Sequence, residues 1–295
     1  MVFAPTGVGK SWFAMAIAAA VSSGASFGHW KVPEACRVLY IDGEMDIADL
    51  KTRFLSIVKA SGGDVDTIGE NIFLYARHDQ PDDDRHFPDF GDTEHADRIL
   101  ELVRHHRPHL VILDNLSTLA SVEDSNAAEA WNPVLEVLKR IKSAGAAVLV
   151  VHHANKGGET YLGSSRIPIL FDTVIRLKPD TSRLGIGSSF LLSFTKSRML
   201  SEDANKTFNI AFSDEKWVWD TLVSPDVLEL VRRILDGEFE TQGAAASALG
   251  KSPGEVSKML KRAYTAGIIT QGEIRAALEA ARYERDESLI DDSDF

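Results

Sequence analysis

The sequence predicts an α/β protein with a mostly parallel sheet, an antiparallel extension of that sheet and a small, mostly helical second domain. Two observations lead to this fold class. From the start of the chain to about residue 151, continuous apolar runs alternate with segments of helical spacing, which is typical of a parallel sheet covered by helices on both faces. Beyond residue 151, strand-like runs follow one another without helices, and beyond Ser224-Pro225 the spacing becomes helical.

The first part of the chain is expected to alternate regularly between helices and strands. The expected helices lie at 11–23, 47–59, 93–106 and 126–143, and the expected strands at 37–42, 72–75, 110–114 and 146–151. Residues 78–92 form an acidic, proline-containing loop. The later strands, expected at 173–177, 189–194, 207–212 and 217–219, suit an antiparallel extension because only short turns join them.

The most specific motif is a phosphate-binding loop at residues 4–11, Ala-Pro-Thr-Gly-Val-Gly-Lys-Ser, in which Ala4 stands where Gly is usual. Backbone N–H groups of such a loop surround phosphate oxygens, Lys10 reaches the β- and γ-phosphates from an exposed position, and the Ser11 hydroxyl ligates Mg²⁺. The following helix aims its positive N-terminus at the same anion. We therefore expect ATP and Mg²⁺ as cofactors, with the nucleotide bound by Ala4, Pro5, Thr6, Gly7, Val8, Gly9, Lys10, Ser11 and Trp12.

Only Met1, Val2 and Phe3 precede this loop, although a phosphate loop follows a strand and buried strands run about 5–6 residues. Either the first strand is a stub or the native protein begins upstream. We favour the second interpretation.

Two acidic groups at strand ends complete the expected chemistry, because ligands of open parallel sheets bind outside the carboxyl ends of the strands. Asp114 ends one strand and is expected to hold Mg²⁺ through water opposite Ser11, the alternative being a cap for the next turn. Glu44 follows another strand and is expected to be the general base that polarises the attacking water. Its alternative is a solvated loop acid or a helix cap, and Asp42 and Asp46 are weaker candidates for the base.

Two basic elements are further candidates. His152 and His153 end the strand at 146–151, and strand alternation directs their rings to opposite faces, so one of them is expected to meet the nucleotide. We assign His153 to sensing the γ-phosphate, with a purely structural role as the alternative. Lys196 and Arg198 follow the strand at 189–194 and suit neutralisation of transition-state charge at a neighbouring subunit's nucleotide, or else form a solvated basic turn.

Together these features resemble the RecA-fold ATPases, and most closely the plasmid and phage RepA-like helicases. The resemblance covers roughly residues 1–200. Besides the phosphate loop it rests on short motifs: Asp42-Gly-Glu44, Leu113-Asp-Asn115, His152-His-Ala-Asn-Lys156, Gly163-Ser-Ser-Arg166 with Asp172, and Lys196-x-Arg198. Ala4 and the missing first strand depart from the family pattern, and no primase or zinc module is recognisable.

The resemblance implies roles for several residues. Glu44 would be the catalytic base, His153 the nucleotide sensor, and Lys196 with Arg198 a pair acting in trans across a subunit interface of a ring, commonly a hexamer. The segment from Asn155 to Arg166, with Lys156 and Arg166, would face single-stranded DNA in the ring channel. Residues 1–222 would then be a RecA-like ATPase domain.

The last part of the chain is expected to form a second domain at 223–275 and an acidic tail at 276–295, partly disordered. A helix marked by Val227 to Leu235, a helix at 241–249, a Gly-containing turn, a helix at 254–266 and a wing-like strand at 267–270 look like a winged helix-turn-helix. Basic residues cluster on its third helix, which predicts contact with duplex phosphates; a protein-contact role is the alternative. The expected DNA-binding residues here are Lys258, Lys261 and Arg262.

Composition excludes several classes of protein and leaves three functions open. The net charge of −12 argues against wholesale coating of nucleic acid, the single Cys36 excludes a disulfide framework, and no apolar run approaches 18 residues. We expect a cytoplasmic protein without a membrane partner. The three hypotheses are an ATP-driven DNA motor, an ATPase that loads or remodels proteins on DNA without unwinding it, and a DNA-binding regulator switched by nucleotide.

Overall fold

The computed structural model covers the whole chain, and the residues it describes are 1–63, 65–79, 87, 89–122, 127–155, 157–163, 167–180, 188–198, 206–213, 216–222, 225–265 and 268–291. The chain divides into two compact units. The first comprises Met1–Leu200 and Asn209–Asp220, and the second Ser201–Phe208 and Thr221–Phe295. The second unit's main segment thus begins two residues before the domain boundary that the sequence predicts.

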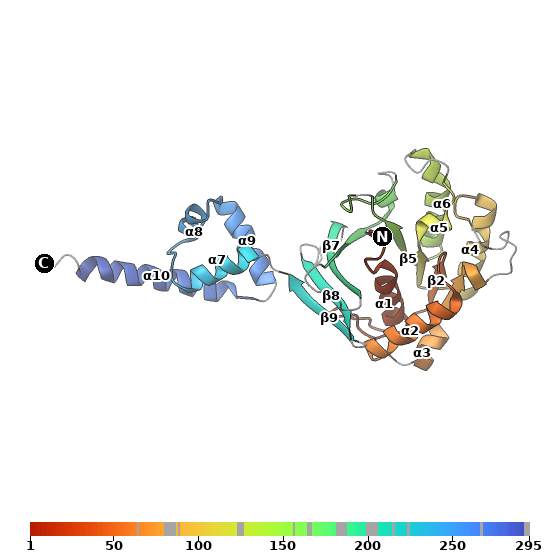
Figure 1. Ribbon diagram of the computed structural model, residues 1–295, viewed down its shortest axis with the longest axis horizontal. Coiled ribbons are helices and arrows are strands. Elements are labelled where there is room, and N and C mark those ends of the chain that lie inside the picture. The colour runs from red at the N-terminus through yellow and green to blue at the C-terminus, as the bar shows by residue number, and fades with distance from the viewer. Residues whose placement is uncertain are drawn as a thin grey trace. The chain divides into compact units, whose positions relative to one another are not determined.

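The first unit is built on one nine-stranded sheet in the order β3-β2-β4-β5-β1-β6-β7-β8-β9 (Figure 1). The strands are β1 (Val2–Ala4), β2 (Val38–Asp42), β3 (Ile72–Ala76), β4 (Leu110–Asp114), β5 (Ala147–His153), β6 (Thr173–Pro179), β7 (Ser188–Ser197), β8 (Thr207–Ser213) and β9 (Lys216–Leu222). The first six pair in parallel, and β7 is antiparallel to β6. The expected parallel core with an antiparallel extension is therefore present, with the difference that the strand expected at 173–177 belongs to the parallel part.

Helices cover both faces of this sheet. They are α1 (Lys10–Ser23), α2 (Ile47–Ser61), α3 (Val65–Asn71), α4 (Thr93–His106), α5 (Leu116–Leu119) and α6 (Asn132–Ser143). Strand alternation divides the faces: Leu39 and Ile41 join a core with α4, α5 and α6, whereas Tyr40 between them meets Phe54 of α2. Helix α1 is apolar nearly all round and is correspondingly buried.

Two local features differ from the expected elements. The short helices α3 and α5 are additional to those that the sequence predicts. The helix expected at 126–143 begins as α6 at Asn132, after a 3₁₀ turn at Glu129–Trp131, and Pro133 lies in the first turn of the α-helix, where proline is tolerated.

The second unit contains α7 (Pro225–Leu235), α8 (Gln242–Ala248), α9 (Pro253–Thr265) and α10 (Gln271–Asp291) around a core of its own. Helices α8 and α9 are joined by a short turn at Gly250, whose φ of +61° lies in the left-handed region that favours glycine. Two expectations fail here. Residues 268–270 bend without forming a strand, and α10 occupies most of the segment expected to be a tail, because Ile274 packs into the core and anchors the helix.

Candidate active site

The phosphate loop connects β1 to α1 and has the backbone conformation that anion binding requires. Gly7 and Gly9 have φ values of +82° and +111°, which favour glycine. A Cβ at Gly9 would lie 2.3 Å from Ser188 Oγ and 3.0 Å from the Phe190 ring, so a larger residue would have to displace these side chains. Ala4, by contrast, is fully buried at the end of β1 and has no such requirement, which explains why alanine is tolerated where the usual motif has glycine.

Lys10 is folded back into the loop, and the expectation of an exposed side chain is wrong. Its side chain is buried, and Nζ donates hydrogen bonds to the carbonyls of Ala4 at 3.1 Å and Pro5 at 3.0 Å. Burial lowers the pKa of Lys10, while the negative charges of Asp114 and Glu44 oppose that shift. The ammonium group is thus held at the mouth of the loop, where a phosphate can replace two carbonyl acceptors.

Ser11 and Asp114 fit a magnesium ion bound together with nucleotide phosphates. The Ser11 hydroxyl donates a hydrogen bond to Asp114, a neighbour that suits the expected sharing of one ion. Asp114 is 3% exposed, and burial raises its pKa to about 6, against the hydrogen bonds from Tyr40 and Ser11. Among the described residues no group of three or more His, Cys, Asp or Glu side chains could hold a metal ion alone, so phosphate oxygens would complete the coordination.

Tyr40 is a site residue that sequence analysis missed. Its buried phenol donates a 2.6 Å hydrogen bond to Oδ2 of Asp114, which fixes the orientation of the carboxylate. Strand alternation, which the sequence shows, puts Tyr40 and Asp42 on the same face of β2, but the register of Asp42 with Asp114 on β4 comes only from strand pairing.

Glu44, the expected general base, lies beside the phosphate loop with its side chain 52% exposed. Its Oε1 accepts a 2.7 Å hydrogen bond from Asn115 Nδ2 and lies 3.9 Å from His153 Nε2. Asp42 is occupied differently: its Oδ1 accepts the backbone N–H groups of Glu44 and Met45 and so shapes the turn that presents Glu44. Asn115, to which sequence analysis gave no role of its own, thus holds the candidate base.

The two histidines at the end of β5 point to opposite faces, as strand alternation predicts. His153 faces Glu44, and its Nδ1 lies 3.5 Å from Thr6 Oγ1 of the phosphate loop. His152 is 1% exposed, packs against Trp131 and bonds through Nε2 to the carbonyl of Leu162 at 2.8 Å. Burial lowers the pKa of His152 to about 4, which leaves it neutral, and burial also lowers the pKa of His153.

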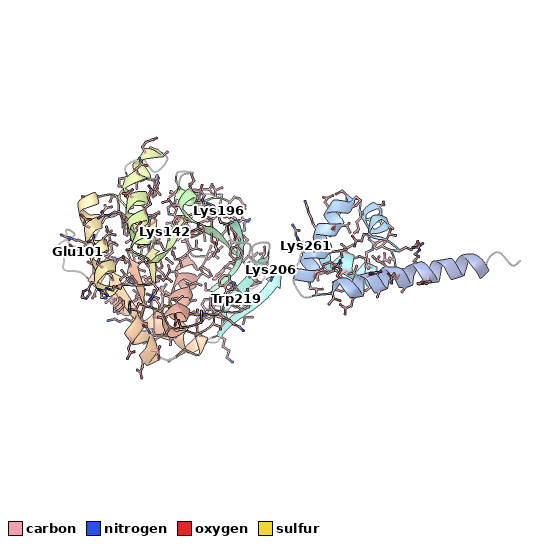
Figure 2. The ribbon with its side chains drawn as sticks, turned by 180° about the vertical axis from the view of Figure 1, so that it is seen from behind. Glu101, Lys142, Lys196, Lys206, Trp219 and Lys261 are labelled. Carbon is pink, nitrogen blue, oxygen red and sulfur yellow. The ribbon has the colours of Figure 1, made fainter. Side chains whose placement is uncertain are left out.

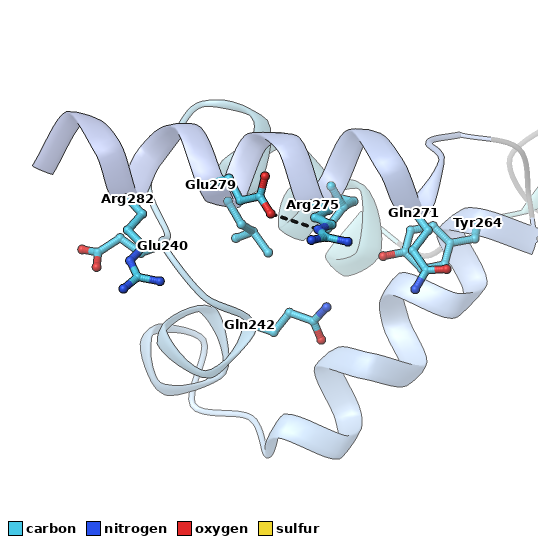
Figure 3. Close-up of a pocket in the computed structure, with 9 residues that line it drawn as sticks. Glu240, Gln242, Tyr264, Gln271, Arg275, Glu279 and Arg282 are labelled. Atoms are coloured by element: carbon cyan, nitrogen blue, oxygen red, sulfur yellow. Dashed lines mark hydrogen bonds and ion pairs between the residues drawn. The ribbon is translucent and has the colours of Figure 1, made fainter. Parts of the chain in front are cut away.

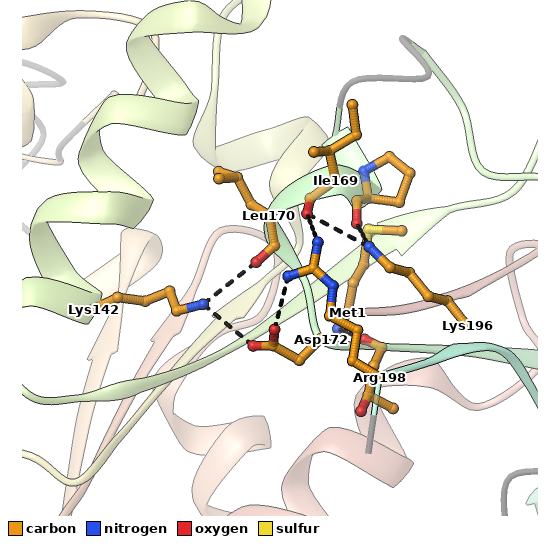
Figure 4. Close-up of polar contacts among 9 residues, drawn as sticks. Met1, Lys142, Ile169, Leu170, Asp172, Lys196 and Arg198 are labelled. Atoms are coloured by element: carbon orange, nitrogen blue, oxygen red, sulfur yellow. Dashed lines mark hydrogen bonds and ion pairs between the residues drawn. The ribbon is translucent and has the colours of Figure 1, made fainter. Parts of the chain in front are cut away.

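Lys196 and Arg198 lie at the other edge of the sheet. Ser197 between them registers with Thr173 at the amino end of β6, whereas the phosphate loop follows the carboxyl end of β1. Lys196 Nζ donates to the carbonyl of Pro168 at 2.8 Å, and Arg198 donates to Asp172 and to the carbonyl of Ile169 at 3.1 Å each (Figure 4). The structure therefore does not bring this pair to its own subunit's nucleotide site; Figure 2 labels Lys196 and the nearby Lys142.

The remaining predicted residues are distributed as follows. Trp12 packs against Phe212 of β8, with their ring centroids 5.0 Å apart, and under the guanidinium of Arg53. Lys156 and Arg166, the expected DNA contacts of the loop after β5, lie outside the described residues. In the second unit Lys258, Lys261 and Arg262 are exposed on α9, and Figure 2 labels Lys261.

The second unit also has a hollow between α10 and the helices α8 and α9 (Figure 3). Its lining mixes both signs of charge with amides, and Arg275 and Glu279 pair across one turn of α10 at 2.9 Å. Nothing in this lining points to a particular ligand.

A comparison with known families identifies the first unit. A family model described as AAA domain matches residues 1–159, which is more than half of the chain. The chain belongs to this family. It is therefore a P-loop NTPase, and the family supports nucleotide binding, typically with Mg²⁺, and ATP hydrolysis. No curated protein matches the sequence. Within the part of the chain that the structure describes, no helix is long and apolar enough to cross a membrane.

Proposed function

We propose that this ATPase is a motor acting on DNA, a replicative helicase of the RepA-like kind that works as a hexameric ring. The observation that carries the proposal is the hairpin at 154–162, which follows β5 directly and lies against the phosphate loop. Its backbone pairs Ala154 with Tyr161, and a Cβ at Gly158 would contact Pro5 at 3.4 Å. In the sequence Lys156 lies between Asn155 and Gly157, and Arg166 follows Leu162 by four residues; both lie outside the described residues. A basic segment joined to the nucleotide site suits an enzyme whose hydrolysis responds to a polyanion.

The proposed chemistry uses the carboxyl edge of the sheet. Lys10 and the loop N–H groups hold the phosphates, and Ser11 with Asp114 would hold Mg²⁺, which neutralises phosphate charge when bound. Glu44, whose Oε1 is held by Asn115, accepts the proton of the attacking water. His153 bridges Thr6 of the loop and Glu44, a position suited to reporting the loss of the γ-phosphate.

The test of this proposal combines hydrolysis with strand displacement. We expect single-stranded DNA to stimulate hydrolysis at low salt, with the stimulation falling steeply as salt rises. We also expect a forked duplex to be unwound only with hydrolysable ATP, and the Glu44→Gln variant to bind DNA without unwinding it. Light scattering in the presence of nucleotide measures the molar mass of the assembly and so tests whether six chains associate. If single-stranded DNA neither binds nor changes the hydrolysis rate, the motor proposal is wrong.

A second candidate is supported by the amino edge of the sheet. Because Lys196 and Arg198 bond to Pro168, Ile169 and Asp172 of their own chain, they do not require a neighbour's nucleotide as a partner. That arrangement favours an ATPase that loads or remodels proteins on DNA, or a nucleotide-switched regulator. DNA-stimulated hydrolysis without strand displacement would support the loading or remodelling function, and DNA binding with negligible hydrolysis the regulator.

A further inference from the structure

The hairpin at 154–162 is fastened to β6 by a single acidic side chain. Glu159 accepts a hydrogen bond from Lys178 Nζ on Oε1 and another from Arg176 Nη1 on Oε2, so both carboxylate oxygens are used. Phe3 registers with Arg176 in the parallel β1–β6 pair, and Tyr161 packs edge-on against Phe3. The hairpin and the two cations therefore share one face of the sheet.

The two cations form a forked receptor for an oxyanion. Arg176 and Lys178 are two residues apart on one strand, so their side chains leave the same face. Arg176 has a buried Nε that lacks a hydrogen-bond acceptor among the described residues, although its Nη1 is paired with Glu159. A carboxylate with two oxygens leaves this donor unmet, whereas a phosphate presents more acceptor positions in the same place.

The present occupant of this receptor is easily displaced. The Glu159 side chain is 62% exposed, and exposed ion pairs contribute little to stability. Arg176 is only 21% exposed, so the cationic side of the pair is the more firmly held. The hydrogen bond from Lys178, with the charge of Arg176, holds the pKa of Glu159 below its ordinary value, so the carboxylate is charged at neutral pH.

We propose that Arg176 and Lys178 form a binding site for a phosphate of the nucleic-acid backbone, and that Glu159 occupies this site as an internal substitute until DNA displaces it. The inference rests on the proposed function, because it assumes that DNA approaches this hairpin. Displacement frees the hairpin from β6. The hairpin also lies against the phosphate loop through Gly158 and Pro5, so the exchange gives DNA a route to the nucleotide site.

The test measures binding of the full chain to a fluorescently labelled oligothymidine, which removes base readout. We expect Glu159→Gln to bind roughly tenfold more tightly than wild type at about 50 mM salt, because two cations become available to phosphate. Its affinity should also fall more steeply with salt, by the equivalent of about one additional phosphate contact. The double variant Arg176→Gln/Lys178→Gln should bind more weakly than wild type with a shallower salt dependence.

Glu136→Gln is the matched control. Glu136 is 60% exposed and pairs with a lysine one turn away on α6, so its replacement changes the net charge equally without touching β6. Equal changes in affinity for the two Gln variants, or a Glu159→Gln variant that binds like wild type, would overturn the inference while leaving the proposed function intact. If neither wild type nor Glu159→Gln binds the oligonucleotide, both fall. Binding by Glu159→Gln alone would support the displacement model.

Discussion

The two edges of the sheet in the first unit hold their charged groups in opposite ways. At the carboxyl edge, Lys10, Glu44 and His153 gather around the phosphate loop. Lys10 bonds to loop carbonyls, Glu44 to Asn115, and His153 lies between Thr6 and Glu44. At the amino edge, Lys196 and Arg198 converge instead on carbonyls and a carboxylate of the segment at 168–172. Lys10 was predicted from the phosphate-loop motif and the other groups from strand-end positions, yet only the first set surrounds a site for an anion.

The difference shows which charged groups are available to a ligand and which are already paired within the chain. Lys10 and Asp114 have pKa values displaced by burial, which is a cost that a bound phosphate and cation would relieve. Arg198 has an exposed side chain and pairs with Asp172, so its charge is already compensated by its own chain. The carboxyl edge is therefore arranged for a ligand, and the amino edge contributes to catalysis only if a neighbouring subunit competes for its cations.

The largest expected effect tests whether Arg198 acts on a neighbouring subunit's nucleotide or only holds the 168–172 segment of its own chain. If Arg198 acts in trans, Arg198→Ala should lower hydrolysis by about 10³–10⁵-fold with little change in ATP affinity. The matched variant Asp172→Asn removes the intrachain partner and should leave hydrolysis nearly intact. Mixing Arg198→Ala with Lys10→Ala protein should restore part of the rate, because some interfaces then pair an intact loop with an intact arginine. Equal losses in Arg198→Ala and Asp172→Asn, without recovery in the exchanged mixture, would assign Arg198 to holding the 168–172 segment.

At the carboxyl edge, Glu44→Gln should lower the rate of hydrolysis by about 10²–10⁴-fold while ATP still binds, because only the acceptance of the water's proton is lost. Single-turnover hydrolysis and nucleotide affinity measure the two effects separately. Asp49→Asn is the control, since Asp49 is an exposed acid in the first turn of α2 to which no role is assigned, and the variant should behave as wild type. A rapid Glu44→Gln enzyme would move the role of base elsewhere, with Asp42 the first candidate.

Lys10→Ala should weaken ATP binding by roughly 10- to 100-fold, as expected for loss of a hydrogen-bonding charged donor to phosphate. Calorimetry with a non-hydrolysable analogue measures the change, and Lys51→Ala on the exposed face of α2 controls for charge alone. Circular dichroism should show the same fold, because among the described residues the Lys10 side chain bonds only to loop carbonyls. Unaltered affinity would contradict the assignment of the loop.

The smallest expected effect on activity concerns His152, which faces away from the nucleotide. Its pKa falls from 6.5 in the unfolded chain to about 4 in the folded one, so the unfolded state binds the extra proton. Its contribution to stability is present above pH 6.5 and is lost as the pH falls towards 4. The free energy of unfolding should fall by about 3 kcal/mol over this range. His152→Gln should remove that part of the pH dependence in urea unfolding, and His153→Gln should remove less. An unchanged slope in His152→Gln would show that His152 does not titrate in this range.

Much of the first unit follows from the sequence because its patterns are local. The spacing around Lys10 and the apolar runs before Asp42, Asp114 and His152 locate both the strands and the residues at their carboxyl ends. Helix α4 and strand β4 have the same bounds as the sequence predicts. The second unit was less predictable: residues 268–270 bend where a wing strand was expected, and α10 fills most of the expected tail. An apolar residue such as Ile274 commits a helix to a core only once α7 and α9 supply one.

The sequence by itself determined the phosphate loop, the order of helices and strands, and the groups available at strand ends, because these depend on residue types at fixed short spacings. The tertiary structure decided which groups meet. Strand order brings β2 beside β4 and β1 beside β5, so Glu44, Asn115 and His153 come together from distant positions. Because β7 runs antiparallel to β6, its end carries Arg198 to the amino edge of the parallel strands. Strand pairing, which spacing along the chain does not encode, is the physical reason for both results.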